Sequence, residues 1–377
     1  MTMRVCTISL NLHTEDFNYG GLLHSWAMQE YLNSLPFVEK TVTLDYVNTK
    51  LEGRCPGYPV KDSWKQGKHL QAVLKAPSIP VTRKRDGEFK SFIEENMTVS
   101  EERYTQAALD NAELDYDTAV CESDVIWHPS YGGHTFDNSY FLYNRCFSGM
   151  NKIAYAPSVG GGRTFSEEEE RLFRVYLGNL DHISCREEEG KRFLMERTEK
   201  PVETVLDPVF LLDAEAYKPI TAPPLRKKPY VLVFAITHAK EIRKTAREYA
   251  RRHGLEVFEI TMNPRDSIIP DATYTAGVEE FLSALRYASA VFTNSFHAIC
   301  FSLLFEREFY VFPRNPKVHY KIAEICCKAG LSDRLFLDRP FKEQEAIDYT
   351  KVRCVLERER RKSQDWLIRA LLAGKER

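Results

Sequence analysis

Short apolar runs alternate with amphipathic helical patterns along most of this chain of 377 residues. In the carboxy-terminal half the pattern predicts strands at 230–236, 255–260, 290–293 and 309–312, and helices at 239–253, 278–287, 296–305 and 318–327. Strands that alternate with helices are typical of a parallel, doubly wound sheet. The pattern therefore predicts an α/β fold.

The amino-terminal half shows the same alternation. Strands are expected at 4–10, 42–47, 118–121, 152–156 and 182–184, and helices at 22–32, 88–96, 167–177 and 187–196. The third of these helices is well marked, because Ser166 and Glu169 form a capping box. The stretch 50–82 is rich in Gly, Pro and Lys, and we expect a long surface loop there, near the site or poorly ordered.

A polar, proline-rich segment at 222–229 separates the two halves and has the composition of an exposed linker. A chain of this length suits two domains rather than one core. We expect an amino-terminal domain at 1–221, a carboxy-terminal domain at 222–342 and a charged helical tail at 343–377. The sequence does not decide whether this tail returns to the first domain.

Composition narrows the class of protein. Hydrophobic residues make up 43% of the chain and the net charge is −2, which indicates a globular protein without general affinity for nucleic acid. With no apolar stretch of about 20 residues and no basic-then-apolar start, we expect a cytoplasmic protein. The nine cysteines form no C-x-x-C pair and the histidines no H-E-x-x-H motif, so no metal is expected.

Polar residues follow several of the expected strands. They occur at 18–21, at 160–163, at Arg186 and at 294–297. Ligands bind beyond the carboxyl ends of parallel strands, where glycine turns offer N–H groups to an anion and arginine offers a bidentate fork. The combination favours a small, multiply charged substrate. Tight turns also explain the glycines, and a salt bridge to Glu187, Glu188 or Glu189 is the alternative for Arg186.

His297 stands at the junction of an apolar strand and an apolar helix, where an imidazole can exchange protons near neutral pH. The alternative is a buried histidine that caps its own helix. Arg314 and Lys317 follow the strand at 309–312 and suit either an anionic ligand or a solvated turn. Asp124 and Trp127 suit a sugar, although a tryptophan more often packs in the core.

Six segments, taken in order, resemble motifs of the polysaccharide pyruvyl transferase family. They are 18–32, 123–129, 152–160, 183–190, 205–212 and 293–305. The resemblance implies a GT-B-like fold, with two Rossmann-like domains and parallel sheets around a central cleft. It implies transfer of pyruvate from phosphoenolpyruvate to two hydroxyls of a hexose in a polysaccharide or lipid-linked repeat-unit precursor, which forms a pyruvate ketal and releases phosphate.

The resemblance also implies roles for matched positions. His297 resembles the family's proton-transfer residue and Arg186 its phosphoenolpyruvate anchor, and we expect Asp124 to orient the acceptor hydroxyl. The other expected donor-binding residues are Ser295, Lys317, Arg314, Gly160 and Gly161, and the expected acceptor-binding residues are Asn18, Tyr19, Gly20, Gly21, Trp127 and His128. No cofactor is expected, because phosphoenolpyruvate is a substrate.

Two positions depart from the family pattern. Ser295 stands where some members carry arginine, which leaves Lys317 or Arg314 to compensate, and Glu122 stands where many members have glycine. Two other functions stay open: a GT-B glycosyltransferase that uses a nucleotide-sugar, and a non-catalytic scaffold in polysaccharide assembly. A lipid-linked acceptor would make the inner membrane face a transient partner of this protein.

Overall fold

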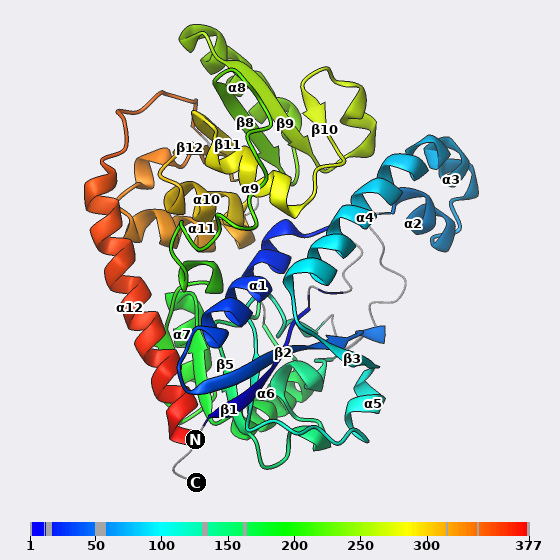
Figure 1. Cartoon of the computed structure of the whole chain (residues 1–377), viewed down its shortest axis with the longest axis vertical. Coiled ribbons are helices and arrows are strands. Elements are labelled where there is room, and N and C mark those ends of the chain that lie inside the picture. The colour runs from blue at the N-terminus through cyan, green and yellow to red at the C-terminus, as the bar shows by residue number, and fades with distance from the viewer. Residues whose placement is uncertain are drawn as a thin grey trace. The chain divides into compact units, whose positions relative to one another are not determined.

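The computed structural model describes residues 2–10, 12, 17–49, 58–129, 135–160, 164–313, 316–337 and 339–374, without the side chains of 267 and 316–320. The chain forms two compact units, each built on a parallel sheet (Figure 1). Unit 1 comprises Met1–Cys55, Ile93–Leu212 and Arg358–Arg377, and unit 2 comprises Pro56–Phe92 and Asp213–Glu357. The predicted α/β fold with two Rossmann-like parallel sheets is confirmed, whereas their arrangement around a cleft stays a prediction.

Unit 1 contains a seven-stranded sheet of order β3-β2-β1-β4-β5-β6-β7. The strands are β1 (Met3–Ile8), β2 (Val38–Tyr46), β3 (Val99–Tyr104), β4 (Thr118–Cys121), β5 (Asn151–Ala154), β6 (His182–Cys185) and β7 (Val202–Thr204). Its helical segments are α1 (Tyr19–Asn33), α5 (Gln106–Leu109), α6 (Glu167–Asn179), α7 (Glu188–Met195), η4 (Asn138–Phe141), η5 (Arg145–Phe147) and η6 (Pro208–Phe210). The chain reverses its direction of growth between β1 and β4, which is where doubly wound sheets bind ligands.

Both faces of this sheet are covered by core. Cys6 and Ala119 belong to one buried cluster, whereas their strand neighbours Val5 and Val120 belong to the other. Because successive side chains of a strand point to opposite faces, apolar residues at both positions require cover on both faces. This cover on both faces explains why the strands of unit 1 appear in the sequence as continuous apolar runs.

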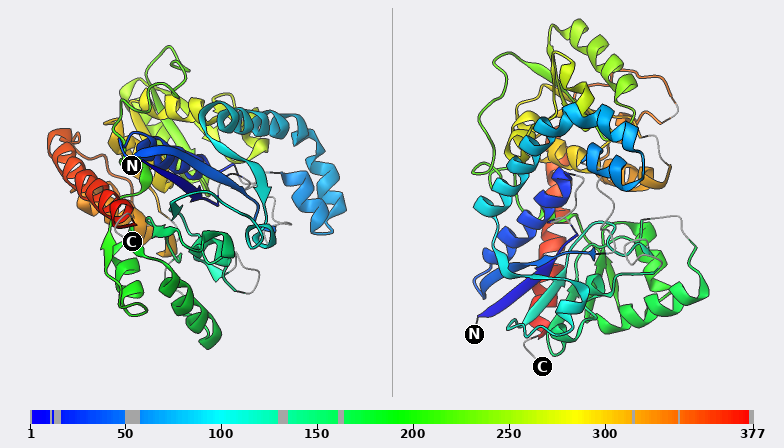
Figure 2. Two further views of the ribbon diagram at one scale, coloured as in Figure 1. Left: turned by 60° about the horizontal axis from the view of Figure 1, so that its bottom comes forward. Right: turned by 90° about the vertical axis from the view of Figure 1, so that its right-hand side faces the viewer.

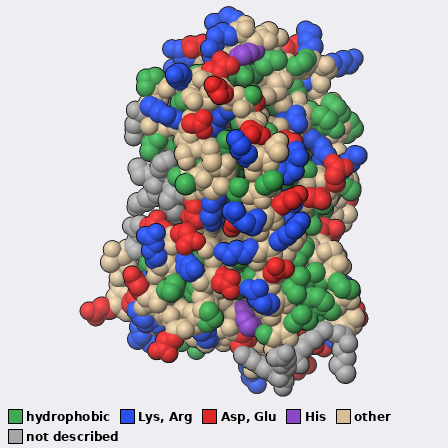
Figure 3. Space-filling model, turned by 90° about the vertical axis from the view of Figure 1, so that its left-hand side faces the viewer, with side chains coloured by type: hydrophobic (Ala, Val, Ile, Leu, Met, Phe, Trp, Pro, Cys, Tyr) green, Lys and Arg blue, Asp and Glu red, His purple; other side chains and the backbone are tan. Residues whose placement is uncertain are grey.

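Helix α12 (Tyr349–Ala373) answers the question left open for the charged tail. Its second half belongs to unit 1, where Trp366 and Leu367 pack in the same cluster as Met28. Asn151 Nδ2 donates to the carbonyl of Ala370 at 2.8 Å. Lys and Arg side chains mix with Asp and Glu over the surface around this helix (Figure 3), so its many charges form no patch of one sign on that face.

Unit 2 contains a five-stranded sheet of order β10-β9-β8-β11-β12. The strands are β8 (Tyr230–Ala235), β9 (Glu256–Thr261), β10 (Ala272–Thr273), β11 (Ala290–Thr293) and β12 (Glu308–Val311). Its helical segments are α2 (Pro59–Lys65), α3 (His69–Lys75), η2 (Ala76–Ser78), α4 (Ile79–Asn96, which continues into unit 1), α8 (Ala239–His253), η7 (Pro264–Ile268), α9 (Val278–Arg286), α10 (Phe296–Leu304), α11 (Pro316–Lys328) and η8 (Ser332–Arg334). The switch point of this sheet lies between β8 and β11.

The prediction of a long loop at 50–82 is wrong from Tyr58 onward, and 50–57 lie outside the described residues. Helices α2 and α3 form instead, and α4 begins at Ile79 rather than near 88. The prolines did not prevent helices, because Pro59 occupies the first turn of α2, where its missing N–H costs nothing.

Segment 56–92 joins unit 2 although it lies between two parts of unit 1 in sequence. The buried guanidinium of Arg85 explains the attachment: Nη1 donates to the carbonyl of Thr261 at 3.2 Å, and the group lies 4.7 Å from the ring centre of Tyr274. One boundary between the units therefore falls at 212/213, and unit 2 also includes segment 56–92. This division differs from the predicted domain boundaries at 221 and 342.

None of the helices in the described part of the chain is both long and apolar enough to cross a membrane.

Candidate functional site

In unit 1 the buried guanidinium of Arg186 lies directly after β6 and contacts carboxylates of its own chain. Nε donates to Glu187 Oε1 at 2.7 Å and Nη1 to Asp207 Oδ2 at 3.0 Å, while Nη2 lies 3.9 Å from Asp124 Oδ1. Burial alone would lower the pKa of Arg186, but these carboxylates outweigh it and raise the pKa. The ion pair with Glu187 matches the salt-bridge alternative, and the predicted anchoring of phosphoenolpyruvate stays a prediction.

Asp124 and Ala156, at the ends of neighbouring strands, have backbone angles that side chains rarely adopt. Their φ angles are 85° and 57°. Such conformations cost on the order of 1–3 kcal/mol each and persist where the surroundings impose them, commonly at functional sites. The carbonyl of Asp124 accepts from Ser158 N at 2.8 Å, and Oδ1 accepts from Val125 N at 2.7 Å. These bonds hold the Asp124 carboxylate in one place.

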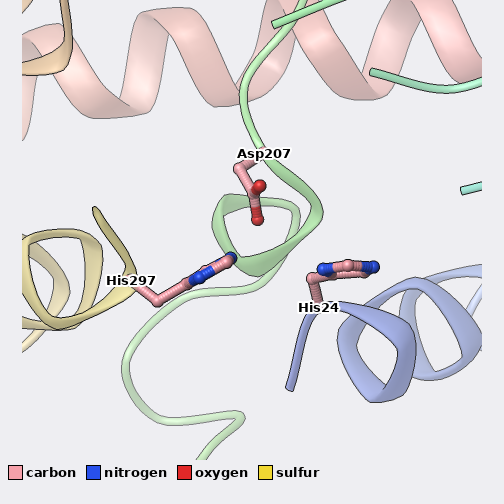
Figure 4. A group of neighbouring side chains, drawn as sticks. All are labelled: His24, Asp207 and His297. Atoms are coloured by element: carbon pink, nitrogen blue, oxygen red, sulfur yellow. The ribbon is translucent and has the colours of Figure 1, made fainter. Parts of the chain in front are cut away.

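A buried pair at the switch point of the same sheet was missed by the sequence analysis. Glu122 follows β4 and His24 lies on α1; both are fully buried, with Nε2 and Oε2 3.7 Å apart. His24 also approaches Asp207, with a ring nitrogen of His24 and a carboxylate oxygen of Asp207 within 4.8 Å of each other (Figure 4). The sequence did contain a signal for this pair, because a glutamate directly follows the apolar run of β4. In the sequence analysis Glu122 appears only as a residue that replaces the glycine of many family members.

Burial raises the pKa of the Glu122 carboxyl, and hydroxyls of Ser25, Thr7 and Ser9 offset part of the rise. The folded state therefore binds the Glu122 proton more tightly than the unfolded state does. The resulting contribution to the free energy of unfolding is fully present below the unfolded pKa of about 4.3 and is lost as the pH rises through the folded pKa. Glu122→Gln lacks this loss. We expect its free energy of unfolding to rise relative to that of the unmodified protein between about pH 4 and pH 7.

Urea unfolding across this pH range checks the prediction, with the exposed Glu199→Gln as control. The opposite trend, in which the unmodified protein gains stability over Glu122→Gln as the pH rises, would mean an ionised Glu122 held by protonated His24 and would contradict it.

In unit 2 the turn after β11 consists of two polar residues, Asn294 and Ser295. Asn294 Oδ1 accepts from Ile236 N at 2.9 Å, and its Nδ2 donates to the carbonyl of Thr237 at 2.7 Å. Asn294 therefore links the ends of β11 and β8 at the switch point of the sheet. Ser295 is the N-cap of α10 and accepts from Ala298 N.

His297 lies in the first turn of α10 (Figure 4) and is half-buried. Its ring is edge-on to that of Phe296. Ser295 supplies the cap of this helix, so the alternative of a histidine that caps its own helix is wrong. The imidazole therefore takes no part in the cap of α10.

A pocket of about 1020 Å³ extends along α8 from the end of β8. Its cationic lining residues are Lys240, Arg243, Lys244, Arg247 and Arg251, and its acidic ones are Glu241, Glu248 and Asp266. Arg243 Nη2 donates to Asp266 at 2.8 Å, so one cation is engaged within the pocket wall. The sequence analysis missed this pocket, although the basic residues recur on one face of an expected helix.

The model of the polysaccharide pyruvyl transferase family matches residues 18–316, which is most of the chain and includes both sets of strand ends. The chain belongs to the polysaccharide pyruvyl transferase family. No curated protein sequence matches it significantly.

Solved structures resemble this family member only distantly. A UDP-GlcNAc 2-epimerase from Neisseria meningitidis bound to UDP-GlcNAc has a TM-score of 0.47 at 10% identity, with 98% of this chain and 100% of that chain covered. A UDP-N-acetylglucosamine 2-epimerase from Rickettsia bellii has a TM-score of 0.45 at 9% identity, covering 99% and 97%. An E. coli heptosyltransferase with ADP has a TM-score of 0.40 at 12% identity, covering 95% and 100%. Similarities this weak indicate no substrate.

The structure places Trp127 of this transferase family member in the core rather than at a sugar site. The side chain is fully buried, its ring stacks on Phe141 with centroids 4.9 Å apart, and Nε1 donates to the carbonyl of Tyr140. The expected role in acceptor binding requires an open indole face. A core tryptophan, the alternative weighed from the sequence, is what forms.

The remaining predicted residues are placed as follows. Asn18 caps α1 by accepting from Gly21 N, and Tyr19, Gly20 and Gly21 are buried in its first turn. Gly160 has φ 88°, and a Cβ there would lie 2.8 Å from Val125 Cγ1 and 3.2 Å from His128 Cδ2, so the turn requires glycine. Gly161, Arg314 and the side chain of Lys317 lie outside the described residues, although Lys317 itself lies within α11 rather than on a loop.

Proposed function

We propose that this protein transfers pyruvate from phosphoenolpyruvate to two hydroxyls of one hexose in a glycan precursor, forming a ketal and releasing phosphate. The observation that carries the proposal is His297, which stands at the switch point of a parallel sheet in a member of the polysaccharide pyruvyl transferase family. Ligands of doubly wound sheets bind at this position, and imidazole transfers protons near neutral pH.

The chemistry requires a proton donor first. Protonation of the phosphoenolpyruvate methylene makes C2 electrophilic, and one sugar hydroxyl adds to C2 and loses its proton. The second hydroxyl then replaces phosphate at C2, which closes the ketal. In this scheme His297 donates the proton to the methylene carbon, and Asp124 orients and accepts from the attacking hydroxyl.

The negative charge of the donor needs cations, since Ser295 supplies only a neutral hydroxyl. Lys240 and Lys244 line the pocket that begins at the end of β8, and the N-terminus of α8 adds the favourable end of a helix dipole. We assign the phosphate group to this pocket, with Lys317 and Arg314 as further candidates. Arg186, held by Glu187 and Asp207, then serves as a positioning residue for Asp124.

Ligand-dependent thermal stability tests the donor assignment. We expect phosphoenolpyruvate to raise the melting temperature, because a ligand at about 100 times its Kd stabilises the folded state by about 2.7 kcal/mol, whereas a nucleotide-sugar has no such effect. Lys240→Gln combined with Lys244→Gln should abolish the shift, and the exposed Lys342→Gln should retain it. Protection by a nucleotide-sugar alone would instead favour a glycosyltransferase.

Product analysis tests the reaction itself. The protein is incubated with phosphoenolpyruvate and a panel of hexosides and lipid-linked sugars, and products are examined by mass spectrometry together with released phosphate. A pyruvylated sugar formed in equal amount with phosphate supports the proposal. Phosphate release without any pyruvylated product from the whole panel contradicts it.

A further inference from the structure

Helices α2 and α3 expose an unusual group of apolar side chains. Trp64, Leu70, Val73 and Leu74 are 60%, 75%, 64% and 66% exposed. The two helices pack against each other beside the first residues of α4 (Figures 1 and 2). Single exposed apolar residues are ordinary, but several gathered on one short element mark an interaction surface.

Three of these side chains share one face of α3. Leu70, Val73 and Leu74 have the spacing of neighbours on a helix surface, whereas Ala72 points inward and is buried. Trp64 of α2 lies beside the start of α3, since its ring contacts that of His69 with centroids 4.5 Å apart. We call these four residues, together with the lysines named next, the α2–α3 hairpin surface.

Four lysines lie in the same short segment as these apolar side chains. Lys61, Lys65, Lys68 and Lys75 accompany a single acidic residue, Asp62, between Pro59 and Lys75, in a chain whose overall net charge is −2. The Nζ atoms of Lys68 and Lys75 donate to the neutral side-chain oxygens of Gln66 and Ser63. The local positive charge is therefore not cancelled by these partners.

We infer that the α2–α3 hairpin surface docks the protein onto a bilayer that contains anionic phospholipids. Exposed tryptophan and leucine together with several lysines in one short helical segment is the composition of segments that lie in the interface of a membrane. Apolar side chains enter the boundary of the acyl chains while the lysines contact the negative head groups.

A bilayer fits this surface better than a protein partner does. A stable protein interface buries about 800 Å² on each partner and uses about 20–30 residues a side, which one face of two seven-residue helices does not supply. An insertion of a few apolar side chains combined with charge attraction needs no such area. Docking of this kind is reversible and sensitive to salt.

Trp64 gives a direct readout of docking. The chain has four tryptophans, and Trp26, Trp127 and Trp366 are buried. We expect vesicles of phosphatidylcholine mixed with phosphatidylglycerol to shift the tryptophan emission to shorter wavelength, and lipids brominated in their acyl chains to quench it. Trp64→Phe should remove both effects, and vesicles of phosphatidylcholine alone should produce neither at low protein concentration.

Vesicle co-sedimentation of the full chain separates the two contributions. Leu70→Ser with Leu74→Ser should weaken binding by about tenfold or more, and Lys65→Gln with Lys68→Gln should weaken it about fivefold for each lysine removed. Matched controls are Val175→Ser with Met195→Ser, which are exposed apolar positions in unit 1, and Lys227→Gln, an exposed cation. The controls should bind as the unmodified protein does.

Several outcomes would overturn the inference. One is the absence of binding to anionic vesicles, and another is an equal weakening of binding by the control substitutions. A third is self-association without lipid that is lost in Leu70→Ser with Leu74→Ser, because it would assign the surface to a second copy of the chain. Circular dichroism of each variant shows that it is folded. The readouts need no turnover, so a failure here is distinguishable from a failure of pyruvyl transfer.

Discussion

Replacing His297 with alanine is expected to lower the rate of pyruvyl transfer by about 10²–10⁴-fold, the usual contribution of a positioned general acid. The loss should appear in kcat with little change in the KM for phosphoenolpyruvate, because in the proposed scheme the imidazole acts on the methylene carbon and the cations that line the pocket along α8 bind the phosphate. Steady-state rates of phosphate release and of ketal formation measure it.

The matched control for this substitution is His253→Ala. His253 is the last residue of α8, its side chain is 40% exposed, and it contacts Glu343 and the ring of Tyr249, so its removal changes contacts at the carboxyl end of α8. Both variants should melt near the temperature of the unmodified protein. A folded His297→Ala protein that turns over at the original rate would falsify the proton-transfer role.

Replacing Arg186 with methionine is expected to lower the free energy of unfolding by about 3–5 kcal/mol, because removal of one partner leaves buried carboxylates without their cation. Asp207 and Glu187, whose side chains are 0% and 3% exposed, lose an ion pair each. Urea unfolding at neutral pH measures the change. Arg174→Met removes a surface pair with Glu170 and should cost at most about 1 kcal/mol.

A double-mutant cycle sharpens the Arg186 prediction. Arg186→Met combined with Asp207→Asn removes a buried cation and one of its buried anions together, so the double variant should be more stable than the sum of the single changes predicts. Additive changes would show that the pair is not coupled. If phosphoenolpyruvate no longer protects an Arg186→Lys variant whose stability is unchanged, Arg186 anchors the donor rather than positions Asp124.

The amount of apolar surface that an element buries explains which helices and strands could be predicted from the sequence. Buried strands such as β4 are apolar throughout and were located from that run alone. Strand β3 at the sheet edge, with the sequence Val-Ser-Glu-Glu-Arg-Tyr, has no apolar run and was not predicted. Helices α2 and α3 were missed because they are short and bury little, so that no helical periodicity of apolar residues marks them.

The candidate site divides in a similar way. The position of His297 at a strand-to-helix junction was visible, because strand, cap and helix are adjacent in sequence and each depends on local preferences. The pairing of Glu122 with His24 was not visible, since it needs β4 to lie beside β1 and α1 to cover their ends.

By itself, therefore, the sequence determined the alternation of strands and helices, the capping box at Ser166 and Glu169, and the family, because these rest on periodicity, local hydrogen bonding and matched motifs. Only the tertiary structure decided that Trp127 is core, that Arg186 is held by Asp207, and that the apolar side chains of α3 face solvent. Those outcomes depend on which distant segments become neighbours, and strand order, which short-range preferences do not encode, sets those neighbours.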